Sequence, residues 1–335
     1  MLTFCDPRQL DHAPQRELNN GEWMPYAEVP TRLERIGTAL GDIGEVTDHG
    51  MDPILAVHDA DYVEFLRTAH DRWLADGREG DAIGYAFPVV HRRKLDHTRI
   101  DASLGAYAMD AATPITGETW QAAYWSVQTA LTGLDALATG ERHAFALCRP
   151  PGHHAGRDYM GGYCYLNSAA IAAHEASTRV LGPVAVLDVD YHHGNGTQDI
   201  FYENADVLFA SIHADPKTDF PYYWGHADET GEGDGEGTTL NLPLPRGTRW
   251  EAYEAALSTA TQRIAEWGAR ALIVSFGADT FQDDPISHFE LTTGDYGRMG
   301  AAIAALNLPT LIVMEGGYDL ASLGENVARF CDGFG

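Results

Sequence analysis

The stretch VAVLDVDYHHGNG, residues 184–196, decides the fold of this chain. Its first residues are apolar at odd and even positions alike, so a strand over 184–190 would bury both of its faces. Such strands occur in parallel sheets that helices cover on both sides. Four further runs have the same character, and together the five predict one sheet. These runs are HAFALC (143–148), DVLFASIH (206–213), ALIVSFGAD (271–279) and TLIVMEGG (310–317).

Segments with a helical period alternate with these runs from residue 118 onward. The clearest is 118–140, in which apolar residues recur every three or four positions and a glycine ends the segment. This alternation predicts an α/β fold with a central, mostly parallel sheet and helices on both faces. Two more helices are predicted near 30–40 and 60–75. No linker or internal repeat divides the chain, so we expect a single domain over 1–335.

The composition limits the classes of partner. A formal net charge of -27 argues against nucleic acid or an anionic membrane as a partner. This charge would attract a cationic ligand, although acidity also serves solubility alone. The four cysteines form no Cys-x-x-Cys pair and indicate free thiols in a reducing compartment. Because neither a signal peptide nor a run of about 18 apolar residues is present, we expect a soluble, cytoplasmic protein.

Polar residues follow four of the predicted strands, at the sheet edge where ligands bind in such folds. Asp190 and His192 are two apart on an extended segment, so both side chains leave the same face. With Asp279 they offer a metal ion two oxygen ligands and one nitrogen ligand, and they leave a position open, as in catalytic sites. An Asp-x-His pair alone is more often a salt bridge at a strand end. Zinc, ferrous iron, cobalt and manganese all suit this set of ligands.

Two adjacent histidines, His153 and His154, follow the first strand. Because adjacent side chains diverge, they suit proton transfer better than joint metal binding. Asp188 and Asn195 are candidate partners for their second ring nitrogens, and a carboxylate raises the basicity of an imidazole more than an amide does. The phenol of Tyr318, after Gly-Gly, would suit a developing oxyanion. A lone histidine is more often a core side chain with satisfied hydrogen bonds, and Tyr318 by its position alone is also explained as a packed tyrosine in a strand-to-helix turn.

The motifs RPPGHHAG, GGYCYLN, LDVDYHHGNGTQ, SIHAD, FGADT and EGGY occur in this order between about residues 145 and 320. They resemble the motifs of the zinc-dependent deacetylases of the arginase/deacetylase fold. Within that family the chain resembles the bacterial acetylpolyamine amidohydrolases most, through Arg16-Glu17-Leu18, a long loop at 77–100 and the QDDPIS segment after Asp279. The resemblance implies hydrolysis of acetylated polyamines or similar small cationic amines.

The resemblance also assigns roles to individual residues. It makes Asp190, His192 and Asp279 the zinc ligands. It makes His154 the general base and acid, His153 its electrostatic partner and Tyr318 the group that polarises the carbonyl, so that metal-activated water attacks directly. A structural potassium or sodium ion is implied at Asp188, Asp190, His192, Ser211 and Ile212. A second, weaker monovalent site is implied at Phe201, Asn204 and Val207.

Substrate contacts are implied along a narrow tunnel. The residues that match the family here are Tyr163, Phe220, Gly162 and Ile286. Acidic side chains at the tunnel mouth would bind the charge of the substrate, and Glu17 matches one of them. Asp101 and Ala112 stand where the family has glutamates, with Asp110 nearby, so the acidic rim is only partly kept. The loop at 77–100 is implied to narrow the tunnel as part of a homodimer.

Three alternatives remain open. A deacetylase that acts on protein acetyl-lysine or on a small acetylated metabolite would share every catalytic residue. A non-catalytic binding protein on the same fold would not need the complete catalytic set that this sequence carries. An arginase-like enzyme would need further Asp and His ligands for a second metal ion, and the sequence shows one set.

Overall fold

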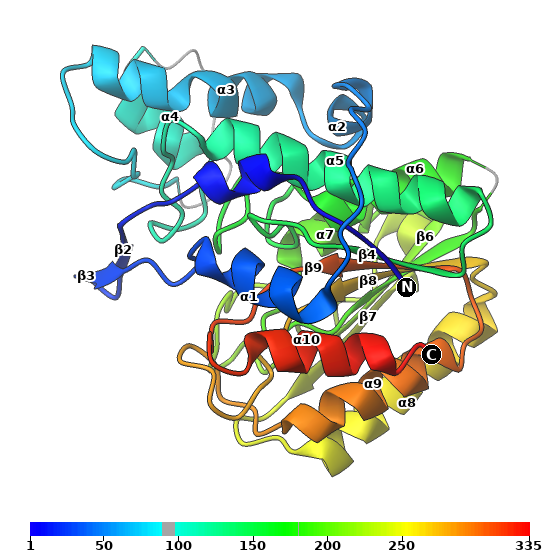
Figure 1. The fold of residues 1–335 in the computed structure, drawn as a ribbon. Coiled ribbons are helices and arrows are strands. Elements are labelled where there is room, and N and C mark those ends of the chain that lie inside the picture. The colour runs from blue at the N-terminus through cyan, green and yellow to red at the C-terminus, as the bar shows by residue number, and fades with distance from the viewer. Residues whose placement is uncertain (89–97, 180) are drawn as a thin grey trace.

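Seven parallel strands form one sheet at the centre of the molecule (Figure 1). The computed structural model describes residues 1–88, 98–179 and 181–335. The strand order is β1-β4-β9-β8-β5-β6-β7, and each neighbouring pair is parallel. An antiparallel pair, β2 and β3, forms a separate small sheet. The predicted α/β fold with a central parallel sheet is confirmed.

The strands are Leu2–Phe4 (β1), Arg16–Asn19 (β2), Glu22–Pro25 (β3), His143–Ala146 (β4), Val184–Asp188 (β5), Val207–Ala214 (β6), Thr239–Leu244 (β7), Ala271–Phe276 (β8) and Thr310–Met314 (β9). The α-helices are Thr31–Leu40 (α1), Asp52–Val57 (α2), Ala60–Ala75 (α3), Ile100–Ala106 (α4), Thr119–Ala138 (α5), Ser168–Thr178 (α6), Asn195–Phe201 (α7), Trp250–Trp267 (α8), Thr293–Ala304 (α9) and Leu323–Asp332 (α10). Two 3-10 helices are Pro7–Asp11 and Gly233–Gly235.

Each face of the sheet has its own apolar core, because successive residues of a strand point to opposite faces. In β5, Val184 and Val186 belong to the core that includes α2, α3, α5 and α6. Ala185 and Leu187 belong to the core that includes α1, α8, α9 and α10. Figure 1 shows these two helix layers on either side of the sheet. Burial of both faces explains why the strands are apolar at every position.

The prediction of a strand through residue 190 is wrong, because β5 ends at Asp188. The N–H of Asp190 donates to Asp188 Oδ1 (3.1 Å), and the N–H of His192 donates to Asp190 Oδ1 (2.9 Å). Aspartate side chains that accept from the backbone two residues on favour turns. The first two candidate ligands therefore lie in the loop after β5, still at the carboxyl edge of the sheet.

Two strands of the main sheet are not predicted by the sequence pattern. β1 has three residues, which is too short for a pattern. β7 contains Pro243 and lies at the sheet edge, where a missing N–H is tolerated. The predicted helices are confirmed as α1, α3 and α5. Of the loop predicted at 77–100, residues 89–97 lie outside the described part of the chain, and α4 begins at its last residue.

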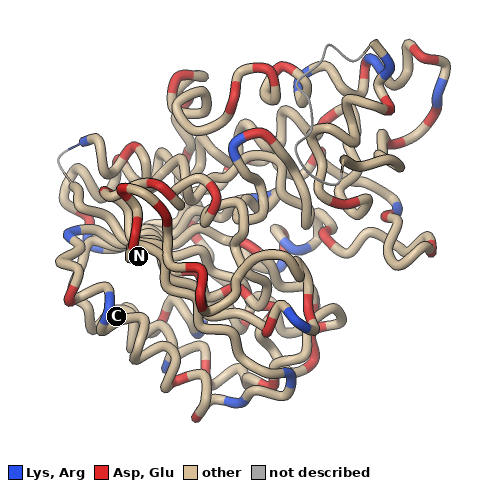
Figure 2. Tube along the Cα trace, turned by 180° about the vertical axis from the view of Figure 1, so that it is seen from behind, with Lys and Arg blue, Asp and Glu red and all other residues tan. Residues whose placement is uncertain are grey.

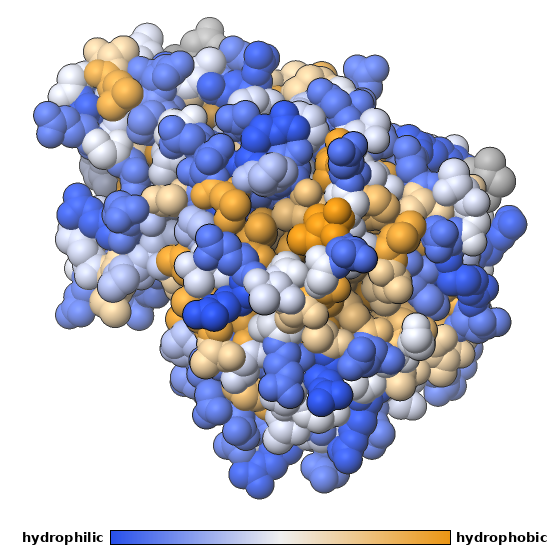
Figure 3. Space-filling view, viewed as in Figure 1, coloured by the Kyte–Doolittle hydropathy of each residue, from blue (hydrophilic) through white to orange (hydrophobic). Residues whose placement is uncertain are grey.

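The surface carries the acidity of the composition. The sequence has 49 acidic and 22 basic residues, and Figure 2 shows the acidic ones distributed over many loops and helices. On the face seen in Figure 3, apolar side chains gather between the layer of α5 and the layer of α1 and α10, with polar side chains around them. Among the described residues, no helix has the length and apolar character needed to cross a bilayer.

Candidate metal centre

Asp190, His192 and Asp279 meet at the carboxyl edge of β5 and β8. One oxygen of each aspartate and one ring nitrogen of the histidine lie within 4.8 Å of one another. His192 Nδ1 lies 3.1 Å from Asp279 Oδ2 and 3.5 Å from Asp190 Oδ1. Both aspartates are fully buried, whereas His192 borders a cavity. The three predicted ligands are thus brought together.

Backbone groups hold both carboxylates and leave the space beside them free of side chains. The N–H of Gly316 donates to Asp190 Oδ2 (2.8 Å), and the N–H of Tyr191 donates to Asp279 Oδ1 (2.9 Å). A Cβ atom at Gly277 would lie 2.0 Å from Asp190 Oδ2, and one at Gly316 would lie 2.6 Å from the same oxygen. Only glycine fits at these two positions. Two carboxylates and one imidazole around this space fit a divalent metal ion.

The electrostatics of the three side chains favour a positive charge between them. Burial and, next, the neighbouring charge of Asp190 together raise the pKa of the Asp279 carboxyl to about 6. Burial lowers the pKa of His192, but its hydrogen bonds with Asp190 and Asp279 more than offset this and raise it to about 10. The two carboxylates therefore make the surroundings of the histidine strongly negative, which suits a bound cation.

Two histidines lie beside this centre, with ring centroids 4.0 Å apart. His153 Nδ1 is hydrogen-bonded to Asp188 Oδ2 (3.0 Å), and His154 Nδ1 is hydrogen-bonded to Asn195 Oδ1 (2.7 Å). Burial lowers the pKa of His153, but the charges of Asp190 and Asp188 offset this and raise it to about 10. Burial lowers the pKa of His154 well below its usual value, and the charge of His153 lowers it further. At neutral pH one histidine is charged and the other is free to accept a proton.

Tyr318 lies in the loop between β9 and α10, where other residues fix its backbone. Its N–H donates to Asp284 Oδ2 (2.7 Å). Arg32 of α1 donates from Nε to Gly317 O (2.6 Å) and from Nη2 to Glu315 O (2.6 Å). Burial raises the pKa of the Tyr318 phenol well above its usual value, so the phenol stays protonated and can donate a hydrogen bond.

A cavity of about 700 Å³ opens above the candidate ligands. Its wall includes His154, His192 and Tyr318, together with the predicted substrate residues Tyr163, Phe220, Gly162 and Ile286. The ring of Phe220 stands perpendicular to that of His154 at 5.1 Å between centroids. A Cβ atom at Gly162 would lie 2.2 Å from a ring carbon of His154, so a larger residue there would displace the histidine. The contact of these residues with substrate stays a prediction.

Glu17 lies behind the cavity wall, in β2. Its Oε1 accepts a hydrogen bond from the phenol of Tyr163 (3.1 Å). Burial raises the pKa of this carboxyl to about 7, although the hydrogen bond from Tyr163 lowers it. The next residues along, Leu18 and Asn19, line the cavity itself. Glu17 is therefore one side chain away from a ligand in the cavity.

The structure does not bring Asp101 to the cavity. Its carboxylate lies at the start of α4 and pairs with two arginines. Arg99 (2.5 Å) directly precedes α4, and Arg78 comes from the segment after α3. Asp110 lines the cavity instead, and its Oδ2 accepts from the N–H of Gly162 (2.6 Å). The cavity wall therefore includes an acidic residue, but this residue is Asp110 and not Asp101.

The residues implied for monovalent cations lie in two places. Asp188 of β5 and Ser211 of β6 are register partners in the sheet, and Ile212 follows directly. Ser211 Oγ shares a hydrogen bond with His213 Nδ1 (2.9 Å). The second set is Phe201, Asn204 and Val207, between the end of α7 and the start of β6. Cation binding at both places stays a prediction.

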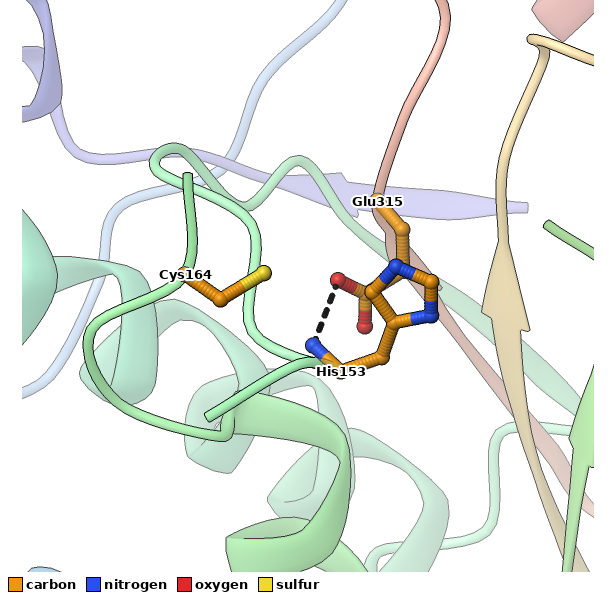
Figure 4. Close-up of side chains that lie close together, drawn as sticks. All are labelled: His153, Cys164 and Glu315. Atoms are coloured by element: carbon orange, nitrogen blue, oxygen red, sulfur yellow. Dashed lines mark hydrogen bonds between the residues drawn. The ribbon is translucent and has the colours of Figure 1, made fainter. Parts of the chain in front are cut away.

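A second buried cluster, formed by His153, Cys164 and Glu315, is shown in Figure 4. The Glu315 carboxylate accepts from the N–H of Gly152 (2.7 Å) and from the N–H of His153 (3.1 Å), the latter drawn as a dashed line. Ser275 Oγ donates to its other oxygen (3.2 Å). Because these oxygens already have partners, we interpret the cluster as a support that fixes the backbone of the histidine pair.

No supporting role is predicted from the sequence for Asp284, Glu315 or Arg32. Asp284 lies within QDDPIS and Glu315 within EGGY, so membership of these motifs is the signal that could have pointed to them. Arg32 lies on a helix, where an arginine is normally expected on the surface. Its side chain is instead buried with Glu28 and Arg149.

Two aspartates and a histidine form a candidate metal-binding cluster, beside an oriented histidine pair and a buried phenol that line a cavity. The histone deacetylase domain matches residues 26–334, and this chain belongs to that family. The chain is 49% identical to acetylpolyamine amidohydrolase 2 of Pseudomonas aeruginosa over 340 residues, which cover 100% of this chain and 98% of the relative. It is 48% identical to the acetylpolyamine amidohydrolase of Mycoplana ramosa, over 99% of this chain and 98% of the relative. The crystal structure of acetylpolyamine aminohydrolase from Burkholderia pseudomallei has a TM-score of 0.96 and 42% identity, with 100% and 98% of the two chains covered.

Proposed function

We propose that this protein hydrolyses the acetyl–nitrogen bond of acetylated polyamines or similar small amines. The observation that carries the proposal is the cluster of Asp190, His192 and Asp279, whose histidine lines one cavity together with His154 and Tyr318. Full-length similarity to proteins named acetylpolyamine amidohydrolases supports the choice of substrate.

Asp190, His192 and Asp279 would hold the metal ion, which is zinc or else ferrous iron, cobalt or manganese. When bound, such an ion polarises the acetyl carbonyl and makes water more acidic. His154, neutral because burial lowers its pKa, takes the proton of the attacking water at Nε2 and returns it to the departing amine. Tyr318, protonated because burial raises its pKa, donates a hydrogen bond to the carbonyl oxygen as negative charge develops there.

The remaining residues of the cavity suit a thin cationic substrate. The aromatic rings of Tyr163 and Phe220 would flank an alkyl chain, and the carboxylate of Asp110 would attract an ammonium group. Glu17, whose hydrogen bond orients the phenol of Tyr163, would add negative charge behind that ring. The overall acidity of the chain acts in the same direction.

We further propose a homodimer, with the loop at 77–100 at the interface and the cavity mouth. Phe87 and Pro88 of this loop line the cavity, which supports the second part of the proposal. Light scattering of the purified protein tests the first part. A cytoplasmic location and structural monovalent cations at the two sets of residues named above belong to the same proposal.

A panel of substrates tests the reaction and its substrate class together. The protein, reconstituted separately with zinc, ferrous iron, cobalt and manganese, is assayed with N-acetylputrescine, N-acetylcadaverine, N8-acetylspermidine and an acetyl-lysine peptide. We expect turnover of the small amines to exceed that of the peptide. Preference for the peptide would replace the proposed substrate with protein acetyl-lysine. Absence of turnover with every substrate and metal, with Tyr318→Phe indistinguishable from wild type, would overturn the enzyme assignment.

A further inference from the structure

The hydrogen bond between His154 and Asn195 is the first of three that lead away from the candidate metal centre. Asn195 Nδ2 donates to the phenol oxygen of Tyr159 (3.2 Å), and that phenol donates to Asp199 Oδ2 (2.7 Å). Asn195 and Asp199 are four residues apart on α7, so both reach the same side of the helix. A continuous chain of side chains therefore joins the carboxylate of Asp199 to the imidazole of His154.

The carboxylate at the end of this chain determines the direction of every hydrogen bond in it. An ionised carboxylate only accepts, so the Tyr159 phenol must donate to Asp199 and can only accept from Asn195. The other neighbours of Asn195 Nδ2 are also acceptors, namely Met109 Sδ (3.3 Å) and His154 O (3.4 Å). The amide therefore cannot be reversed, and its oxygen must face the imidazole. As a consequence His154 Nδ1 carries a hydrogen, which leaves Nε2 with its lone pair.

The position of Tyr159 is itself tightly defined. A Cβ atom at Gly156 would lie 2.2 Å from the Tyr159 ring, so the ring occupies space that only a glycine leaves open. On its other side the ring stacks on Trp224, with 6.3 Å between centroids and 26° between planes. The indole of Trp224 also hydrogen-bonds the carboxyl of Asp199. The phenol is thus held between the amide and the carboxylate, while the side chain also lines the cavity.

We propose that Tyr159 and Asp199 are positioning residues, which fix the Asn195 amide and thereby hold His154 in the tautomer whose Nε2 accepts a proton. The effect on turnover rests on the proposed hydrolase function. The tautomer itself does not depend on it. An amide alone can present either its oxygen or its nitrogen to an imidazole. The Tyr159 phenol, at 3.2 Å, is the nearest of the three acceptors that fix the Asn195 amide, and Met109 Sδ and His154 O lie farther away.

Two variants and one control test the proposal. Tyr159→Phe keeps the ring against Gly156 and Trp224 but removes the phenol, and Asp199→Asn removes the charge while keeping a similar shape. Tyr202→Phe removes a phenol at the end of the same helix, outside this chain of hydrogen bonds. For Tyr159→Phe we expect kcat to fall about tenfold, the size of one lost hydrogen bond, with KM and bound zinc unchanged. Asp199→Asn should lower kcat less, and Tyr202→Phe should match wild type.

The nitrogen spectrum of the histidines supplies a readout that is independent of activity. In zinc-loaded protein labelled with 15N-histidine, the signals of His154 are assigned from their absence in His154→Ala. Wild type should show a protonated Nδ1 and an unprotonated Nε2, and Tyr159→Phe should show a mixture of the two tautomers. A single unchanged tautomer together with unchanged kcat would overturn the inference. An increase in KM with unchanged kcat and an unchanged tautomer would also overturn the inference. Tyr159 would then act only as a residue of the cavity wall.

Discussion

Asp190 and His154 both lie close to His192 but differ in what each side chain can do there. Asp190 is fully buried and offers an oxygen to the candidate metal, whereas His154 lacks a direct hydrogen bond to any of the three candidate ligands in the described chain. We expect Asp190→Ala to lose the metal, and His154→Ala to retain it while kcat falls by about 100-fold or more. Metal content by plasma mass spectrometry, measured beside kcat, checks both. Retention of metal by the first variant and loss by the second would reverse the roles.

Glu17 predicts a dependence of stability on pH, because its carboxyl titrates at about 7 in the folded protein against 4.5 for an ordinary glutamate. Between these pH values the folded state binds more protons than the unfolded state, so stability from this group decreases as pH rises through the window. In Glu17→Gln this loss is absent. The melting temperature of the variant, relative to wild type, should therefore increase between about pH 5 and pH 8.

Glu22→Gln is the matched control for this measurement, since Glu22 is an exposed glutamate on the neighbouring strand β3. Its melting curve should follow wild type at every pH. A melting temperature of Glu17→Gln that stays parallel to wild type across the whole range would show that the Glu17 carboxyl is ionised throughout.

At the scale of elements, a buried ion cluster joins α1 to the segment that follows β4. Arg32 of α1 pairs with Glu28 (2.6 Å), which also accepts from Arg149 after β4 (2.8 Å), and these side chains are nearly inaccessible to water. Arg32→Met leaves Glu28 paired with Arg149 but removes the donor of the carbonyl oxygens of Gly317 and Glu315. Each unsatisfied buried group costs about 1–3 kcal/mol, so we expect the free energy of unfolding to fall by about 2–6 kcal/mol. Urea denaturation measures this. Arg67→Met, in an exposed pair with Glu64 on α3, should change it by less than about 0.5 kcal/mol.

The sequence predicts those elements whose pattern of apolar residues is visible within a single short segment. The five buried strands follow from continuous apolar runs, and α1, α3 and α5 follow from apolar periodicity, since each pattern extends over enough residues to be distinctive. The end of β5 does not, because Asp188 and Asp190 turn the backbone through side-chain hydrogen bonds that periodicity cannot register. The edge strands β1 and β7 are not predicted either, since a strand at the edge of a sheet can be short and only partly buried.

The same division applies to the site. The candidate metal ligands and the histidine pair belong to short motifs at the ends of predicted strands. The sequence alone therefore predicts that they lie at one edge of the sheet. Asp101 could not be excluded from the cavity in this way, because its pairing with Arg78 and Arg99 depends on how α3 and α4 pack. Likewise the partnership of Tyr159 and Asp199 joins residues 40 positions apart and appears only in three dimensions.

At the scale of the whole molecule, the net charge of -27 is either a means of attracting a cationic substrate or only a means of staying soluble. Attraction over a distance is screened by salt, since the Debye length falls from about 30 Å at 0.01 M to about 3 Å at 1 M ionic strength. We expect kcat/KM for N-acetylputrescine to decrease several-fold over this range, because its free ammonium group is drawn to the protein. N-butylacetamide has the same alkyl chain without the charge, and its kcat/KM should stay constant. Equal responses of the two substrates would mean that the acidity serves solubility, and recognition of the amine would then rest on Asp110 and Glu17 at short range.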